Sequence, residues 1–116
     1  MVNEINKLLV DFSDATQTYD EAYNKIINKY KKLWKKYKLP EEVFLDEKIQ
    51  EEQVPVFTYD NAKSVVQKIT LLPNGEFKLR VKTISSGNIW DNVDVNFVKR
   101  KYLILALSLA FSKFID

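Results

Sequence analysis

Hydrophobic residues recur at helical spacing near the N-terminus of the chain. From about residue 3 to residue 38 they fall every three or four positions, which predicts one long amphipathic helix. Asp14 and Gln17 have the spacing of a capping box and could interrupt it. We expect the stripe to pack in a core, with a partner helix or a dimer seam as the alternative. It consists of Ile5, Leu8, Phe12, Ala15, Tyr19, Ala22, Ile26, Tyr30, Leu33 and Tyr37.

Residues 102–115 near the C-terminus are almost continuously apolar, with Lys113 as the only charge. This composition predicts a helix that is covered on more than one side. The stretch is shorter than the roughly 20 apolar residues that a membrane span needs, so we expect no membrane insertion. We predict that Asp91, Asn92 or Asp94 caps this buried helix and that it ends near Phe114.

Proline and acidic residues mark two elements in the middle of the chain. The residue before a proline is pushed out of the α region, so Pro40 should end the first helix. Two glutamates follow it, which predicts a short acidic helix over residues 40–53. Residues 56–59 are expected to form a short edge strand. The residues expected to dock the acidic helix are Val43, Phe44 and Ile49.

A β-hairpin is predicted around Pro73-Asn74-Gly75, which separates two strand-like segments. A two-residue loop would mix apolar and charged residues on both faces. A three-residue loop places Leu71 opposite Phe77 and sorts the two faces, so we favour that register. It further pairs Ile69 with Leu79, Gln67 with Val81, and Val65 with Thr83.

The second face of this hairpin would be basic. It would hold Lys68, Lys78, Arg80 and Lys82, with Lys68 directly opposite Arg80. Like charges in opposite positions destabilise a sheet, so this face should be solvated or meet an anion. A third strand is expected to return through Ile89 and Trp90.

The pattern as a whole predicts a single α+β domain over residues 1–116. Its parts would be a long N-terminal helix, a short acidic helix, a three- to four-stranded antiparallel meander and a buried C-terminal helix.

Composition restricts the chemistry that is open to the chain. There is no cysteine and no histidine, which excludes disulfides, thiolate metal sites and the commonest general base. The two glycines lie in separate turns, so no glycine loop can cradle a phosphate. We expect no catalytic residue, no cofactor and no metal, and a cytoplasmic location.

One motif would indicate an enzyme. Glu76-Phe77-Lys78 matches the E-x-K half of a metal-dependent nuclease motif, with Asp60 as the upstream acid. A strand of nine residues would separate Asp60 from Glu76 by roughly 30 Å, which is too far to share a metal ion. We therefore expect a binding protein without enzymatic activity.

The charges are segregated along the chain although the net charge is only +2. Residues 25–38 contain seven lysines and no acid, whereas residues 39–60 contain seven acids and one lysine. Basic clusters of this kind are typical of phosphate binding. The candidate nucleic-acid-binding residues are Lys29, Lys32, Lys35, Lys36, Lys68, Lys78, Arg80 and Lys82.

Electrostatic, largely sequence-independent binding of nucleic acid is therefore the first functional hypothesis. The alternative is that the lysines are solvated or pair with the acidic segment. The protein would then be a protein-binding inhibitor or adaptor, such as a virus or mobile element encodes, and could form a homodimer.

Overall fold

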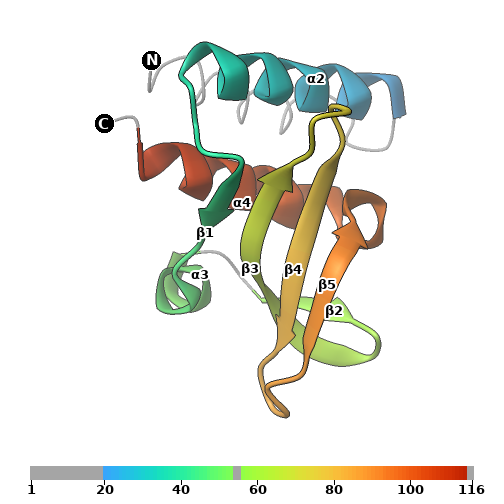
Figure 1. The fold of residues 1–116 in the computed structure, drawn as a ribbon. Coiled ribbons are helices and arrows are strands. Elements are labelled where there is room, and N and C mark those ends of the chain that lie inside the picture. The colour runs from blue at the N-terminus through green and yellow to red at the C-terminus, as the bar shows by residue number, and fades with distance from the viewer. Residues whose placement is uncertain (1–19, 54–55, 115–116) are drawn as a thin grey trace.

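An antiparallel sheet packed against helices forms the structure of residues 20–53 and 56–114, the part that the computed structural model describes (Figure 1). This confirms the predicted α+β class. The segment before residue 20, with Asp14 and Gln17, lies outside the described residues. The elements in order are α2 (Asp20–Lys36), β1 (Glu42–Phe44), α3 (Glu47–Gln53), β2 (Phe57–Tyr59), β3 (Ala62–Leu71), β4 (Phe77–Thr83), β5 (Ile89–Asp94), the 3₁₀ helix η1 (Val95–Phe97) and α4 (Arg100–Ser112).

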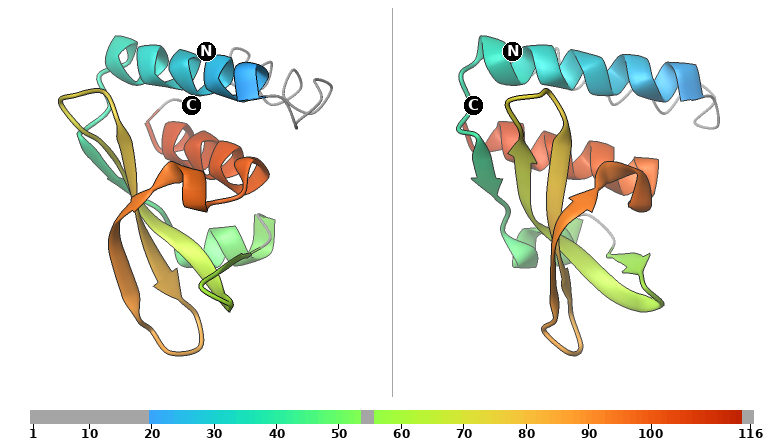
Figure 2. Two further views of the ribbon diagram at one scale, coloured as in Figure 1. Left: turned by 90° about the vertical axis from the view of Figure 1, so that its right-hand side faces the viewer. Right: turned by 45° about the vertical axis from the view of Figure 1, so that its right-hand side comes forward.

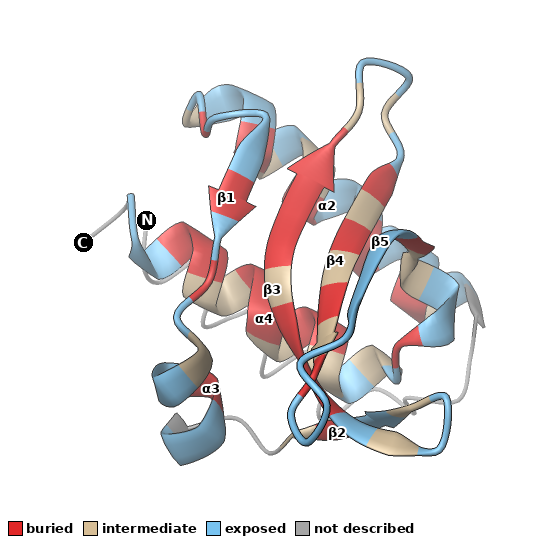
Figure 3. Cartoon of the chain, turned by 60° about the horizontal axis from the view of Figure 1, so that its bottom comes forward, coloured by how far each residue is buried: buried red, intermediate tan, exposed pale blue. Residues whose placement is uncertain are grey.

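Strand β3 is the centre of the sheet, whose order is β1-β3-β4-β5. Strands β1 and β2 both pair with the same edge of β3, at Lys68–Thr70 and Ala62–Ser64 respectively. Figure 3 shows the contrast between β3, which is buried along most of its length, and β5, whose first four residues are exposed.

Helix α4 packs against the sheet, and α2 lies alongside it (Figure 2). The predicted buried C-terminal helix is thus confirmed. Tyr30 of α2 packs on Phe111 with 5.5 Å between ring centroids. Trp34 contacts both Phe111 and Phe77 at 5.9 and 5.5 Å, which ties α2 to α4 and to the hairpin. The buried residues of α4 are Leu103, Ile104, Ala106, Leu107, Ala110 and Phe111.

The expected start of α4 was wrong by several residues. Strand β5 continues to Asp94, whose carboxylate accepts a hydrogen bond from the Asn96 backbone at 2.9 Å and caps η1 instead. Helix α4 begins only at Arg100. Aspartate is equally suited to cap either kind of helix, so the sequence pattern did not distinguish them.

The apolar stripe of α2 faces the core, as expected. In the described part of the helix its inward residues are Tyr23, Ile26, Ile27, Tyr30 and Trp34, all buried. These side chains are therefore not available as a dimer seam.

The acidic helix begins later than expected. Residues Glu42–Phe44 form β1, in which Val43 is buried while its two neighbours are exposed, the alternation of a strand. Helix α3 starts at Glu47, after Asp46 has accepted a hydrogen bond from the Lys48 backbone at 2.9 Å. Ile49 has 38% of its surface exposed and lines a hollow with Leu45 and Leu109.

The hairpin loop has the predicted three residues. Leu71 lies opposite Phe77, Ile69 opposite Leu79, and Gly75 has a φ of +89°. The glycine therefore takes the left-handed conformation that this loop requires.

The predicted register fails beyond Lys68. A bulge at Gln67 shifts β3 by one residue, so that Val66, not Gln67, faces Val81. Val65 then lies opposite Lys82 and Ser64 opposite Thr83. The bulge brings Val66 into the core, where only 1% of its surface is exposed.

The side chain of Gln50 completes the edge of β3 between β1 and β2. Its amide nitrogen donates to the Val66 carbonyl at 2.5 Å, and its oxygen accepts from the Val66 N–H at 2.9 Å. The Leu45 N–H donates to the Gln67 carbonyl beside it at 2.9 Å. A glutamine carboxamide thus replaces one residue of a strand at the point where neither β1 nor β2 reaches.

Strand β5 has the outer position beside β4. Trp90 lies opposite Val81 and Ile89 opposite Lys82. Trp90 is therefore on the face of the sheet that carries the core, where it packs on Tyr59 with 6.0 Å between ring centroids.

We predict that Gln50→Leu destabilises the fold. The change leaves the buried N–H and C=O of Val66 unpaired, at about 1–3 kcal/mol for each group. Urea unfolding should show a loss of about 2–4 kcal/mol, whereas Glu52→Ala, an exposed change on the same helix, should have little effect. Equal stability of the two variants would contradict this role of Gln50.

Candidate nucleic-acid interface

Four lysines of α2 form a line along the outer surface of the helix. Lys25, Lys29, Lys32 and Lys36 are spaced by four, three and four residues, so they project from one side. All four are exposed, as is Lys35 beside them. The buried stripe occupies the opposite side of the helix. We call Lys25, Lys29, Lys32 and Lys36 the lysine line.

Most of these lysines have no acidic partner within the described part of the chain. None of the ion pairs found there involves Lys25, Lys29, Lys32 or Lys35. The Lys36 ammonium lies over the ring of Tyr37, 5.1 Å from its centroid. Lys25, Lys29 and Lys32 therefore present positive charge to solvent that no acid of the described residues neutralises.

The four basic residues of the hairpin, which we call the hairpin cations, are in a different situation. Lys68, Lys78, Arg80 and Lys82 each form an ion pair with an acid of this chain. The Lys68 ammonium lies 3.3 Å from Glu42 and 5.8 Å from the centroid of the Phe44 ring. Only 7% of Lys68 is exposed, so this cation is not available to a large ligand.

The other hairpin cations pair with acids of β5, α3 and the hairpin loop. Lys78 lies between Asp94 at 3.8 Å and Glu76 at 3.9 Å. Lys82 contacts both carboxylate oxygens of Glu47, at 3.1 and 3.2 Å.

Arg80 lies opposite Lys68 and is neutralised from the other side. Its guanidinium donates to the Asp91 carboxylate at 2.9 Å. This hydrogen bond holds the pKa of Asp91 below its ordinary value and raises that of Arg80. The two like charges are tolerated because Glu42 and Asp91 each compensate one of them.

The hairpin cations extend along the hairpin away from α2, with Lys78 lining the same hollow as Lys31 of α2. Trp34, on the buried side of α2, packs on Phe77 at the loop end of the hairpin. Lys82 lies five residues further along β4, roughly 17 Å away at 3.3 Å per residue. The eight residues predicted from the sequence therefore divide into two groups, and the structure leaves the α2 group open to solvent.

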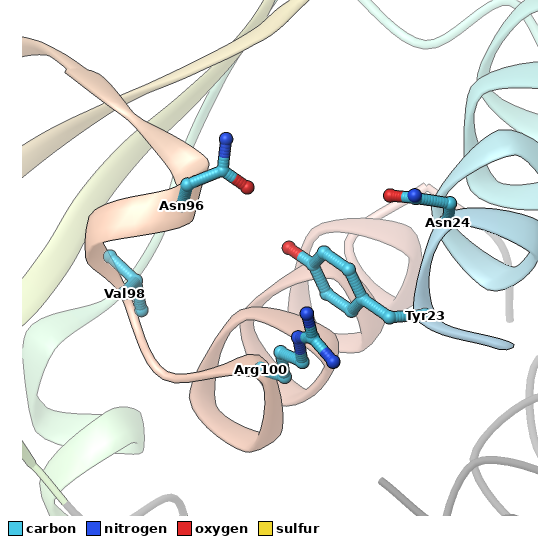
Figure 4. A pocket seen from close by; sticks show the side chains of 5 residues that line it. All are labelled: Tyr23, Asn24, Asn96, Val98 and Arg100. Atoms are coloured by element: carbon cyan, nitrogen blue, oxygen red, sulfur yellow. The ribbon is translucent and has the colours of Figure 1, made fainter. Parts of the chain in front are cut away.

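A second feature is a polar groove between the first turns of α2 and the segment that joins β5 to α4. It encloses about 430 Å³ and is lined by Tyr23, Asn24, Asn96, Val98 and Arg100 (Figure 4). An adjoining hollow of about 200 Å³ extends it toward Lys31 and the hairpin. Sequence patterns gave no signal for this groove, because its residues come from two segments that are more than 70 positions apart in the sequence.

Tyr23 forms the inner wall of the groove. The Arg100 guanidinium lies over its ring, 4.4 Å from the centroid. Among the described residues, the Tyr23 hydroxyl is one of two buried side-chain atoms without a hydrogen-bond partner; the other is Nε of Arg80. Burial raises the pKa of Tyr23 to about 12, against the opposing charge of Arg100.

The E-x-K motif forms no metal site in the structure. Glu76 lies at the loop end of the hairpin, whereas Asp60 lies in the turn before β3, at the far end of that ten-residue strand. No group of acids in the described residues is arranged to hold a metal ion. Nor does any helix of the described chain have the length and apolar character needed to cross a membrane.

Comparison with known proteins adds no functional evidence. No protein-family model, no curated protein and no solved structure matches the chain.

We predict an alkaline loss of stability that is linked to Tyr23. Its pKa is higher in the folded protein, near 12, than its ordinary value of 10.0, so folding favours the neutral phenol. The resulting stabilisation is complete below pH 10 and is lost as the pH rises toward 12. Unfolding curves should show a shallower decline over this range for Tyr23→Phe than for the native chain. Equal slopes would show that Tyr23 titrates normally.

Proposed function

We propose that this protein binds the phosphate backbone of nucleic acid through the exposed lysines of α2. The observation that carries the proposal is the division of the basic residues into two groups. The hairpin cations are paired with acids of the chain, whereas the lysine line faces solvent opposite the core.

The dimensions of the lysine line fit a run of phosphates. From Lys25 to Lys36 the helix rises about 16 Å at 1.5 Å per residue. Phosphates of one DNA strand follow each other at about 3.4 Å along the duplex axis, so about five fall within that length. Lysine is a point charge without arginine's planar fork, which favours backbone contacts over base recognition.

Salt dependence provides the direct test. If Lys25, Lys29 and Lys32 each neutralise one phosphate, the slope of log affinity against log salt should be about −2.7 for duplex DNA. Gel-shift titrations between about 50 and 200 mM salt would measure it. Absence of any shift at about 50 mM would contradict the proposal.

Two matched variants distinguish binding by the α2 surface from binding by positive charge anywhere on the protein. Replacing Lys25, Lys29 and Lys32 by glutamine should reduce the slope by about 2.7 units. The control replaces Lys48, Lys63 and Lys101, three exposed lysines elsewhere, and has the same net charge. Equal losses in both variants would show that α2 is not the binding surface.

A protein partner is the second candidate, and one observation favours it. Three large apolar residues beside the turn between β4 and β5 are exposed, namely Ile84, Ile89 and Trp90, at 40%, 53% and 40% of their surface. Trp90 lies on the core face of the sheet and Ile89 on the other face, so a partner that covers the outer edge of β5 would contact both. For an inhibitor or adaptor, Trp90→Ser would abolish partner binding, whereas the α2 glutamine variant would alter mainly the association rate.

A further inference from the structure

We propose that the polar groove between α2 and η1 is a binding site for a phosphate monoester. It is separate from the lysine line, and the Tyr23 hydroxyl is its central hydrogen-bond donor. Part of the inference rests on the proposed function, because one source of the phosphate is the end of a bound strand; the other is a free mononucleotide.

The unpaired hydroxyl of Tyr23 is the first observation. Only 4% of Tyr23 is exposed, and its hydroxyl points into the space between Asn24 and Asn96 (Figure 4). A buried hydroxyl without a partner destabilises a protein, so such groups are uncommon in folded proteins. A ligand oxygen that accepts this hydrogen bond would remove the cost.

The groups around the hydroxyl favour an anionic acceptor. The amides of Asn24 and Asn96 face one another across the groove with their oxygens toward it (Figure 4). A half-turn of either amide would present its NH2 group, which can donate two hydrogen bonds. The Arg100 guanidinium covers the Tyr23 ring, and its charge lowers the pKa of the phenol, whereas the Asp94 carboxylate raises it. Both asparagines are exposed, so their side chains can turn to admit a ligand to the hydroxyl.

The adjoining hollow extends the groove toward the hairpin. Lys31 lies on its wall, with its ammonium 5.9 Å from the centroid of the Phe77 ring. Two acids, Glu76 and Asp94, also line the hollow, but both are paired with Lys78. Lys78 carries one positive charge against these two acids, so Lys31 brings the lining of the hollow to a balance of charge.

The size and polarity of the groove indicate an organic phosphate larger than the inorganic ion. Its volume of about 430 Å³ lies in the range of small-molecule sites. Four of the five residues that line the groove are polar, and Val98 is the exception. A lining of this polarity is unsuited to an apolar ligand.

The test measures binding of adenosine monophosphate, and of two short oligonucleotides that differ only in a terminal phosphate or hydroxyl. The proposal expects the mononucleotide at millimolar concentration to shift the backbone amide resonances of Asn24 and Asn96, or the phosphorylated strand to bind more tightly than its hydroxyl twin. The first result identifies a free nucleotide as the source, and the second a strand end.

Two variants connect the binding to the groove. Tyr23→Phe should weaken the phosphate-dependent binding by about tenfold, the worth of a hydrogen bond to a charged group. Its melting temperature should be no lower than that of the native protein, because the lost hydroxyl has no partner. Tyr59→Phe removes the same atom at the far end of the sheet and should bind as the native protein does. Asn96→Asp places a negative charge at the rim and should abolish binding independently of Tyr23.

The results distinguish this proposal from the previous one. The variant that lacks Lys25, Lys29 and Lys32 should lose affinity for both oligonucleotides but retain the response to the mononucleotide. If the mononucleotide causes no shift and the two oligonucleotides bind equally, the groove proposal is wrong, whatever the salt slope shows. Unchanged phosphate-dependent binding in both Tyr23→Phe and Asn96→Asp would also overturn it.

Discussion

Helix α4 must be covered on more than one side, and this constraint determines the arrangement of the rest of the chain. Six of its residues are buried, and fully burying a leucine or phenylalanine stabilises a fold by about 1.5–3 kcal/mol. The sheet covers one side, and α2 lies along another. Tyr30 and Trp34 set the rotation of α2, because both rings pack on Phe111.

That rotation decides where the positive charge of α2 lies. With Tyr30 and Trp34 turned inward, the lysine line can only point away from the core. The hairpin cations lie on the opposite face of the sheet from α4, where acids of β1, α3 and β5 reach them. The segregation of charge in the sequence is thus partly cancelled in space: Glu42 and Glu47, from the acidic segment, neutralise lysines of the hairpin and not those of α2.

Local patterns predicted the elements whose conformation depends on residues close by in the sequence. The three-residue loop, the pairing of Leu71 with Phe77 and the inward stripe of α2 follow from turn chemistry and periodicity. The bulge at Gln67 could not be predicted, because it depends on the Gln50 side chain reaching Val66 from another element. Strand β1 was taken for a helix because a proline followed by glutamates suits a helical first turn, while the free edge of β3 was unknown.

The same reasoning explains which parts of the candidate sites could be anticipated. The lysine line is visible in the sequence as a helical period, and its exposure follows once the opposite stripe is buried. The pairing of the hairpin cations and the groove around Tyr23 depend on contacts between distant segments, so neither has a sequence signature.

The central claim is that the positive charge available to a ligand lies on α2 and not on the hairpin. Acetylation of lysines in the native protein, followed by mass spectrometry, measures this directly. We expect Lys25, Lys29 and Lys32 to react much faster than Lys68, with the difference disappearing in urea. Equal rates for Lys68 and the α2 lysines in the native protein would contradict the account.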